Sequence, residues 1–318
     1  MKVMVTGAAG FIGSHLCQKL LKAGYNVVGI DNFLPNYPRA MKEENLKHLT
    51  GAKHFTFIEG DLATLNLKSC LRRTSIIFHL AGQPGVRDSW GSKFLSYSRN
   101  NLEATQRLLE ASTSNPLDLF VYASTSSVYG YEGKLDGPLS EDIPLHPFSP
   151  YGITKLAAEQ LCSAYFRNLG LPTVALRFFS VYGPRQRPDM GFHQMILSVL
   201  QGKPIKLHAG DQRRDFTYVG DIVNGSFSTV NARRDSILGK AINLGGGRVT
   251  ALSEAIRTIE ALTQHTASIE ELPNPHGNVL VTWADISRAK ALLGYQPGTD
   301  LENGLAEEVT WNKSTYHI

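Results

Sequence analysis

The sequence predicts an α/β fold: a Rossmann-type doubly wound parallel sheet followed by a smaller α/β C-terminal domain. Short apolar, β-branched runs alternate with stretches of helical periodicity through residues 1–178, an order typical of parallel strands joined by right-handed crossovers. A glycine-rich turn directly follows the first of these runs. After Arg177 the chain changes to loops rich in Gly, Pro and Arg. We therefore expect one domain in residues 1–178 and a second in 179–318, with part of 217–246 packing back on the first.

Seven runs have the composition of strands, namely Lys2–Thr6, Asn26–Ile30, Phe55–Glu59, Ser75–Leu80, Leu117–Ala123, Val174–Arg177 and Ile242–Gly245. Ligand-contacting residues of a doubly wound sheet lie just beyond the carboxyl ends of its strands. Glycine or polar residues occupy these positions, namely Gly7, Asp31, Asp61, Gln83 and Thr125. Further along, Ala251–Thr263 has a helical pattern with Thr250 as its expected cap, and two more helical stretches follow.

Composition excludes several classes of function. The net charge of +4 over 318 residues is not concentrated in a basic tract, so no nucleic-acid partner is expected. No apolar run is long enough to span a bilayer, so no membrane partner is expected either. The three cysteines, Cys17, Cys70 and Cys162, lack metal-ligand spacing, which predicts a reduced, cytoplasmic protein without a metal site.

The turn Gly7-Ala8-Ala9-Gly10-Phe11-Ile12-Gly13 lies between a strand and a helical pattern. In such a turn the first glycine permits the tight bend, the second lets the backbone approach a pyrophosphate, and the third allows close helix packing. The second strand ends at Asp31, whose carboxylate would accept hydrogen bonds from ribose hydroxyls and repel a 2′-phosphate. This combination predicts a dinucleotide site that takes NAD rather than NADP.

A second group of residues has the chemistry needed to move a proton on an alcohol. Ser124-Thr125-Ser126-Ser127 ends an apolar run, and Tyr151 and Lys155 are four residues apart. On a helix, residues at that spacing lie on one face. A cation beside a phenol favours the phenolate and lowers its pKa from its usual value near ~10.

Together, GAAGFIG, Asp31, STSSVYG and YGITK resemble the extended short-chain dehydrogenase/reductases, and within them the NAD-dependent nucleotide-sugar epimerase/dehydratase family. The resemblance extends through LRFFSVYGPRQRPDM and QRRDFTYV, so it covers essentially the whole chain. It implies NAD binding by residues 1–178 and nucleotide-sugar binding by 179–318. It also implies a catalytic triad of Thr125, Tyr151 and Lys155: Tyr151 as general base, Lys155 holding it as phenolate and contacting the nicotinamide ribose, and Thr125 bonded to the reacting hydroxyl.

The same resemblance implies the cofactor contacts. They are Gly7, Gly10, Phe11, Ile12, Gly13, Asp31, Asn32, Asp61, Leu62, Leu80, Ala81, Gln83, Asn100, Tyr151, Lys155 and Phe179.

The residues that follow Thr125 indicate the reaction. Dehydratases of similar pattern carry an Asp-Glu pair after the Thr, and decarboxylating relatives keep a Glu before Val-Tyr-Gly. This chain has Ser126-Ser127. With no carboxylate there, oxidation and re-reduction at one carbon is the favoured reaction, which predicts a 4-epimerase acting through a transient 4-keto sugar.

QPGVRDS and RFFSVYGPRQRPDM resemble UDP-glucuronate 4-epimerases more than UDP-galactose 4-epimerases. A uronate needs a cationic partner, and Arg pairs with carboxylates bidentately. Arg87 and Arg187 are the candidates, although either could instead bind only the diphosphate. The remaining substrate contacts that the resemblance implies are Thr125, Ser126, Ser127, Ser180, Leu207, His208, Arg214 and Asn278. His193 either reaches the pocket or lies on the surface at a helix start.

Two alternatives stay open from the sequence. One is a 4-epimerase of a neutral UDP-sugar such as glucose or its N-acetyl form. The other, from a different class, is a non-catalytic NAD-binding scaffold, which would have no need of Tyr151 and Lys155. Relatives commonly form homodimers through a four-helix bundle, and the corresponding helices here would be Leu95–Ala111 and Tyr151–Phe166.

Overall fold

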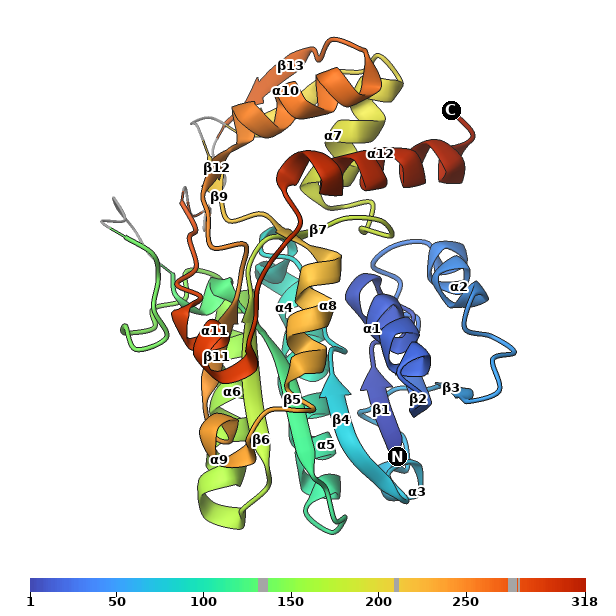
Figure 1. The fold of residues 1–318 in the computed structure, drawn as a ribbon, viewed down its shortest axis with the longest axis vertical. Helices are drawn as coiled ribbons and strands as arrows, with labels where there is room; N and C mark the ends of the chain where they lie inside the picture. The colour runs from blue at the N-terminus through green and yellow to red at the C-terminus, as the bar shows by residue number, and fades with distance from the viewer. Residues whose placement is uncertain (131–136, 209–211, 274–278, 280) are drawn as a thin grey trace.

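A seven-stranded parallel sheet forms the centre of the molecule (Figure 1). The computed structural model describes residues 1–130, 137–208, 212–273, 279 and 281–318. The strands follow the order β11-β6-β5-β4-β1-β2-β3, and every neighbouring pair is parallel. Their bounds are β1 Lys2–Thr6, β2 Asn26–Asp31, β3 Phe55–Glu59, β4 Thr74–His79, β5 Leu119–Thr125, β6 Thr173–Phe178 and β11 Ala241–Leu244. The predicted Rossmann-type fold class is confirmed.

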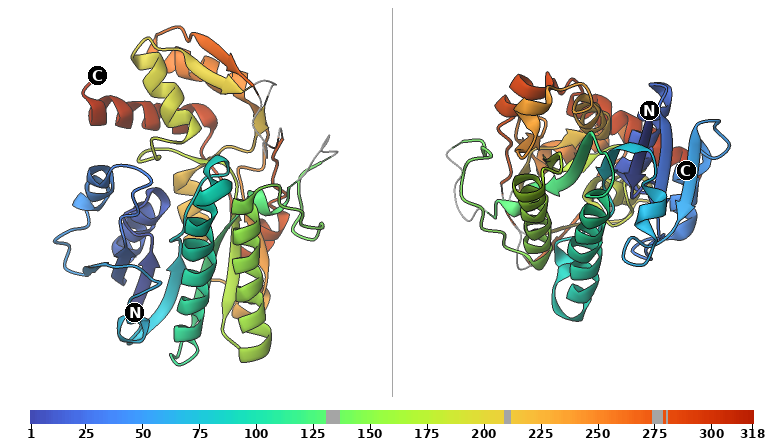
Figure 2. Two further views of the ribbon diagram at one scale, coloured as in Figure 1. Left: turned by 180° about the vertical axis from the view of Figure 1, so that it is seen from behind. Right: turned by 90° about the horizontal axis from the view of Figure 1, so that it is seen from below.

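Helices cover both faces of this sheet (Figures 1 and 2). One face carries α1 (Phe11–Lys22), α8 (Val219–Ser228) and α11 (Ser287–Leu293), with α2 (Arg39–Lys47) against α1. The other carries α3 (Leu67–Cys70), α5 (Ala104–Ser112) and α6 (Pro150–Leu169). Because side chains alternate along a strand, Val3 and Val5 belong to the first core and Met4 to the second.

The helix predicted over 95–111 is not uniform. It consists of α4 (Phe94–Tyr97), a π-helical segment η3 (Ser98–Glu103) and α5. Asn100 and Asn101 lie in the π-helical part, and asparagine is a weak helix former. Such wide turns are frequent at functional sites.

A smaller lobe, drawn above the sheet in Figure 1, is built on α7 (Gly191–Leu200), α10 (Leu252–Thr263) and α12 (Leu301–Tyr316). Three two-stranded pairs accompany these helices: β8 (Ile205–His208) with β13 (Ile269–Leu272), β9 (Arg213–Arg214) with β12 (Thr250–Ala251), and β7 (Val181–Tyr182) with β10 (Thr217–Tyr218).

The expected cap of α10 was wrong. Thr250 pairs with Arg214 in the β12–β9 ladder, and the helix begins at Leu252 after Ala251, without a side-chain cap. The helix begins one residue later than expected, so Ala251, which pairs with Arg213 in the same ladder, takes the cap position with extended backbone.

The chain returns to the large sheet after entering the smaller lobe. α8 packs on α1, β11 extends the sheet beside β6, and the short helix α9 (Arg234–Ile237) connects them. α11 then covers β11, a contact that the sequence did not indicate. In the described part of the chain, no helix is long and apolar enough to cross a bilayer.

Candidate active site

The glycine turn after β1 brings three backbone segments into close contact. Gly7 has φ +72°, and a Cβ there would lie 2.9 Å from the Ala81 nitrogen. A Cβ on Gly13 would lie 2.1 Å from the Gly7 oxygen. Gly10 precedes α1, and no side chain caps the helix. Its first N–H groups and the positive end of its dipole can therefore receive a phosphate.

Asp31, the last residue of β2, binds the backbone of the glycine turn through its carboxylate. Its Oδ2 accepts a hydrogen bond from the Ala9 nitrogen at 3.1 Å, and its Oδ1 accepts one from the Phe33 nitrogen at 2.8 Å. Burial raises the pKa of this carboxyl, and the charge of Lys42 opposes that shift. The carboxylate is thus held where the ribose of a dinucleotide would reach it.

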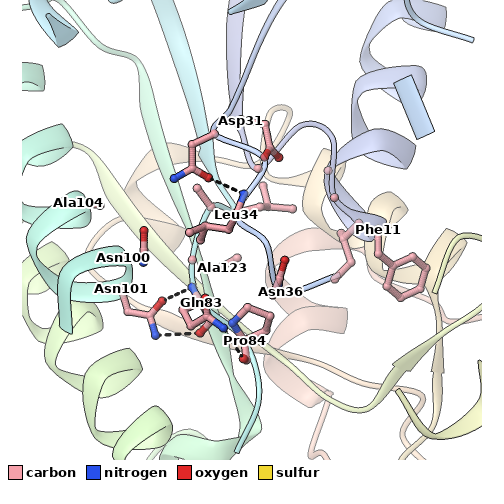
Figure 3. Close-up of a pocket in the computed structure, with 18 of the residues that line it drawn as sticks. Phe11, Asp31, Leu34, Asn36, Gln83, Pro84, Asn100, Asn101, Ala104 and Ala123 are labelled. Carbon is pink, nitrogen blue, oxygen red and sulfur yellow. Dashed lines mark hydrogen bonds between the residues drawn. The ribbon is translucent and has the colours of Figure 1, made fainter. Parts of the chain in front are cut away.

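A pocket opens along the carboxyl ends of the central strands (Figure 3). Fifteen of the sixteen predicted cofactor contacts line it: Gly7, Gly10, Phe11, Ile12, Gly13, Asp31, Asn32, Asp61, Leu62, Leu80, Ala81, Gln83, Asn100, Tyr151 and Lys155. The uncapped helix and the glycine cradle suit the diphosphate of NAD, and Asp31 suits its ribose.

Phe179 is the exception among the predicted contacts. Its side chain is fully buried in the core and packs against Tyr129 with ring centroids 6.1 Å apart. Phe178, one residue earlier, lines the pocket instead. Alternation along the strand end sends the two rings to opposite sides.

The catalytic candidates meet at the carboxyl end of β5. Ser149 caps α6 by accepting a hydrogen bond from the Gly152 nitrogen at 3.1 Å, and Pro150 begins the helix. Tyr151 is therefore in the first turn and Lys155 in the second. A hydrogen bond joins the side chains of Tyr151 and Thr125, the last residue of β5.

Desolvation raises the pKa of Tyr151, while the hydrogen bond to Thr125 and then the charge of Arg187 lower it. Lys155 lines the same pocket: its Nζ donates to the Ala123 oxygen and lies 4.3 Å from the centre of the Tyr122 ring. Burial lowers the pKa of Lys155 to about 8. Thr125 and Arg187 thus oppose the rise in the Tyr151 pKa that burial causes.

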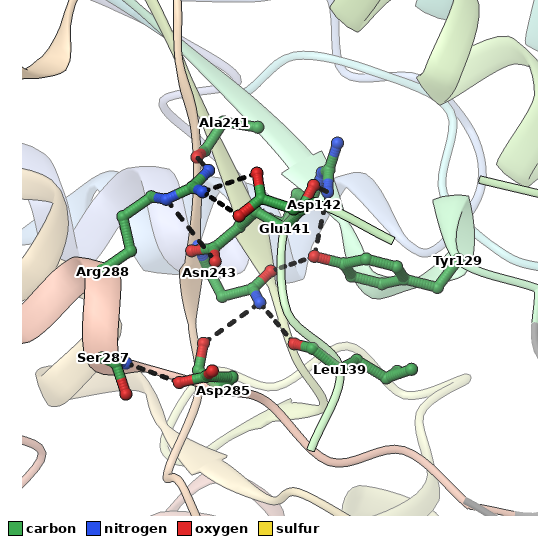
Figure 4. A network of polar contacts seen from close by, with 10 residues as sticks. Tyr129, Leu139, Glu141, Asp142, Ala241, Asn243, Asp285, Ser287 and Arg288 are labelled. Atoms are coloured by element: carbon green, nitrogen blue, oxygen red, sulfur yellow. Dashed lines mark hydrogen bonds and ion pairs between the residues drawn. The ribbon is translucent and has the colours of Figure 1, made fainter. Parts of the chain in front are cut away.

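A buried polar network connects α6, the helix that carries Tyr151 and Lys155, to the sheet. Arg177 Nη2 and Glu159 Oε1 form an ion pair at 2.6 Å, and Ser124 donates to Glu159 Oε2 at 2.6 Å. Arg177 also donates to the Tyr129 hydroxyl, which donates to Asn243 Oδ1 at 2.6 Å (Figure 4). The network therefore links α6, β5, β6 and β11.

The sequence did not single out Asn101, which lines the pocket beside Asn100 (Figure 3). Its Oδ1 accepts from the Gln83 nitrogen at 2.7 Å, and its Nδ2 donates to the Gln83 oxygen and to Thr154 Oγ1. Asn101 thereby fixes the loop after β4 to the helix that carries Tyr151. Two consecutive asparagines inside a helical pattern were the available signal.

Lys42, Asn36 and Tyr37 also line the pocket and were missed. Lys42 is buried, donates from Nζ to the Leu34 oxygen at 2.7 Å and lies over the Tyr37 ring. Asn36 Oδ1 and the Tyr37 hydroxyl are buried without a hydrogen-bond partner among the described residues. Nothing in the sequence separates Lys42 from an ordinary surface lysine.

Of the two candidate arginines, only Arg187 lines the pocket. Arg87 is exposed in the short helix η1 (Arg87–Ser89) and does not line the pocket. Irregular turns after Pro84 direct it to solvent, as is usual for arginine.

The other predicted substrate residues within the described ranges do not line this pocket. Ser126 and Ser127 begin η4 (Ser126–Val128) directly after Thr125, and the Ser180 oxygen accepts from the Thr217 nitrogen. Leu207 and His208 end β8, and Arg214 Nη2 donates to Gln212 Oε1. Asn278 lies outside the described residues.

His193 is neither in the pocket nor on the surface. It is fully buried in α7, where its Nδ1 contacts the Gln186 oxygen and its Nε2 the Tyr316 hydroxyl, both at 2.9 Å. The imidazole ring of His193 packs against the rings of Trp311 and Tyr316 of α12. Among the described residues, no group of three or more His, Cys, Asp or Glu could hold a metal ion.

Comparison with known proteins agrees with this geometry. A profile of the NAD dependent epimerase/dehydratase family matches residues 3–245. An uncharacterised UDP-glucose epimerase of Bacillus subtilis, YtcB, is 47% identical over 318 residues, covering 99% of each chain. A UDP-glucuronate 4-epimerase of Thermodesulfobacterium geofontis is 37% identical, covering 99% of this chain and 97% of its own.

The solved structures include a UDP-glucuronic acid 4-epimerase of Bacillus cereus in complex with UDP-glucuronic acid and NAD. It superposes with a TM-score of 0.96 at 44% identity, covering 99% of this chain and all of the other.

Proposed function

This chain belongs to the NAD-dependent epimerase/dehydratase family, and we propose that it is a 4-epimerase that interconverts UDP-glucuronate and UDP-galacturonate. The observation that carries the proposal is the position of Tyr151 in the dinucleotide pocket, hydrogen-bonded to Thr125 and within the field of Arg187. A base for an alcohol proton and a cation for a carboxylate thus lie in one cavity.

In the proposed mechanism, Tyr151 as phenolate takes the proton of the C4 hydroxyl, and Thr125 holds that hydroxyl in place. NAD, when bound, accepts the C4 hydride and returns it to the opposite face of the sugar. Tyr151 then gives the proton back. Lys155, whose ammonium faces the end of β5, would hold the nicotinamide ribose, and Asn101 fixes the Gln83 loop on the other side.

Epimerisation is favoured over elimination or decarboxylation by the residues that surround Thr125. Ser126 and Ser127 follow it in η4, and Thr125 donates to Ser127 Oγ at 3.3 Å. Hydroxyls at these positions can hydrogen-bond a sugar but do not supply the acid and base that loss of water requires.

Arg187 supports a uronate as the preferred sugar. Its guanidinium suits a carboxylate, and its side chain is largely buried at the pocket wall. The 4-keto form of a uronate is a β-keto acid, which loses carbon dioxide when the C5–carboxyl bond aligns with the carbonyl π system. A firmly held carboxylate prevents that alignment.

A neutral sugar is the second candidate, favoured by the 47% identical relative, which is described as a UDP-glucose epimerase. Purified protein incubated separately with UDP-glucuronate and UDP-glucose, with products resolved by NMR, discriminates between the two. We expect the 4-epimer of the uronate as the main product. Turnover of UDP-glucose without turnover of the uronate would replace the first candidate by the second, and turnover of neither would favour the scaffold.

The oligomeric state is a further part of the proposal. Leu95 is 74% exposed and Ile153 52% exposed, on the adjacent elements α4 and α6, and Trp90 and Phe94 are exposed nearby. Figure 2 shows α5 and α6 side by side on the same face of the sheet. An apolar surface on paired helices is what a four-helix-bundle homodimer would cover.

Location and domain division are proposed as well. Cys17, Cys70 and Cys162 are free thiols, which supports a cytoplasmic location. We assign NAD binding to residues 1–178 and binding of the nucleotide sugar to residues 179–318. Residues 217–246 contain α8 and β11, which pack with the NAD-binding domain.

A further inference from the structure

The loop between β7 and α7 is attached to the molecule on two sides. Toward α1, the Pro184 oxygen contacts His15 Nε2 at 2.9 Å, and Arg185 donates to Ser14 Oγ and Gln18 Oε1. Toward α7, buried Gln186 accepts from the His193 nitrogen at 2.8 Å. The backbone that leads to residue 187 is therefore held by both lobes.

The side chain of Arg187 is held separately. Its Nε donates to Asp189 Oδ1 at 3.0 Å and its Nη2 to Asp189 Oδ2 at 2.9 Å. A guanidinium has two edges that can bind a carboxylate bidentately: one made by Nε and Nη2, the other by the two Nη atoms. Asp189 occupies the first, and Nη1 makes no hydrogen bond within the described ranges.

The two members of this pair differ in their surroundings. The Arg187 side chain is 18% exposed and that of Asp189 is 48% exposed. Arg187 lines the pocket and Asp189 does not. The Asp189 carboxylate therefore contacts the Arg187 guanidinium from the solvent side. Burial raises the pKa of Tyr151 and that of Tyr97, and the positive charge of Arg187 opposes both shifts.

We infer that Asp189 is a positioning residue that selects for acidic sugars: it holds one edge of Arg187 so that the edge made by the two Nη atoms receives the substrate carboxylate. This inference rests on the proposed function. An arginine on a loop would otherwise sample many rotamers, and fixing it in advance lowers the cost of binding.

The inference has a consequence for the product. In the 4-keto uronate, the C5–carboxyl bond can break, leaving its electron pair on C5 and the C4 oxygen as an enolate while carbon dioxide departs. The enolate then takes a proton from solvent at C5 and becomes a 4-keto pentose. The hydride taken from C4 stays on the cofactor as NADH. A carboxylate held by a loosely positioned Arg187 can reach the geometry that permits this loss.

The test uses Asp189→Asn, which keeps the shape and removes the charge, and Asp189→Glu, which keeps the charge. Asp142→Asn is the matched control, because Asp142 is 79% exposed and both of its carboxylate oxygens accept from Arg288 Nη2 at 2.7 Å (Figure 4). Products from UDP-glucuronate and UDP-glucose are quantified by NMR, and NADH by absorbance. Melting temperatures show that each variant is folded.

We expect Asp189→Asn to raise KM for UDP-glucuronate by about tenfold and to increase the ratio of 4-keto pentose and NADH to epimer. KM for UDP-glucose should change by less than about twofold. Asp189→Glu should restore most of the wild-type product ratio, and Asp142→Asn should behave as wild type.

Three outcomes would overturn the inference. An unchanged KM and product ratio would show that Asp189 does not act on the carboxylate. A lower KM for the uronate would make Asp189 a competitor for Arg187, and equal losses for both sugars would assign Arg187 to the diphosphate. Wild-type protein that leaves UDP-glucuronate unchanged is a distinct result, which removes the proposed function and this inference together.

Discussion

The Lys155 ammonium donates a hydrogen bond of 2.5 Å to the carbonyl oxygen of Ala123, two residues before Thr125. This contact fixes the second turn of α6 to the carboxyl end of β5, so that Lys155 and Thr125 approach the pocket from neighbouring elements. Glu159, one turn further along α6, contributes a favourable charge that opposes the effect of burial on the Lys155 pKa. The three proposed catalytic side chains are thus positioned by the meeting of one strand end and one helix start.

Tyr151→Phe should bind NAD and be inactive, because the change removes only the hydroxyl that exchanges a proton with the sugar. We expect kcat to fall by at least about 10²-fold, the lower range for loss of a general base. Calorimetric titration with NAD and a turnover assay on UDP-glucuronate measure the two properties. Turnover close to wild type would refute the proposed mechanism.

Gly13→Ala should weaken NAD binding strongly. Its Cβ would lie 2.1 Å from the Gly7 oxygen, which is backbone and cannot move without opening the turn. We expect the dissociation constant for NAD to rise by at least about 100-fold. Gly298→Ala is the matched control, because no atom lies within 4 Å of the added methyl. Equal affinities for the two variants would show that the turn does not cradle the cofactor.

The sequence predicted those parts of the site that local pattern determines. The glycine turn, Asp31 at a strand end and the Tyr151–Lys155 spacing each lie within a short segment, and a parallel sheet gathers strand ends at one edge. Their shared pocket follows from the fold class alone.

Contacts between distant segments could not be predicted in the same way. Arg87 and Arg187 both lie in irregular loops, and only the folded loop anchored by His15 and His193 directs Arg187 inward. The buried Lys42 donates a hydrogen bond to the Leu34 carbonyl oxygen. Thr250 pairs with Arg214 in a two-stranded ladder. None of these partners is close enough in sequence to leave a periodic signal.

Arg187→Ala should separate acidic from neutral sugars. Loss of a charge-assisted bidentate contact costs about 2–5 kcal/mol, so kcat/KM for UDP-glucuronate should fall by about 30-fold or more. For UDP-glucose we expect a fall of less than about fivefold. Arg87→Ala should show no selective loss, since Arg87 is exposed. Equal losses for both sugars in Arg187→Ala would assign this arginine to the phosphates.

Leu95→Glu should convert the proposed dimer to a monomer, because it places a charge at an apolar position of α4 that is 74% exposed in the single chain. Leu169→Glu is the control: this leucine is 62% exposed at the last position of α6, outside the expected bundle. Light scattering at micromolar concentration gives the mass. A monomeric wild type would contradict the proposed assembly.

Acid should destabilise the protein partly through His79, the last residue of β4. Its Nδ1 lies 2.7 Å from Thr6 Oγ1 and its Nε2 lies 2.9 Å from Thr105 Oγ1. Thr6 Oγ1 accepts from the Ala81 nitrogen and Thr105 Oγ1 donates to the Asn101 oxygen. Each hydroxyl completes its bonding when Thr6 donates to Nδ1 and Thr105 accepts from Nε2–H, which requires a neutral imidazole. Burial first, and the Lys155 charge second, lower the pKa of His79 to about 3.

An unfolded histidine titrates near ~6.5, so between about pH 6.5 and about pH 3 the unfolded chain binds a proton that the folded chain does not. The free energy of unfolding should therefore decrease as the pH falls through this window, by up to about 1.4 kcal/mol per pH unit from His79 alone. Urea titrations at several pH values measure the slope. His79→Gln should reduce the slope of the free energy of unfolding against pH by the contribution of one proton. At neutral pH, loss of the bond to Thr6 should lower the free energy of unfolding by about 1–3 kcal/mol. An undiminished slope in His79→Gln would show that His79 does not supply the proton.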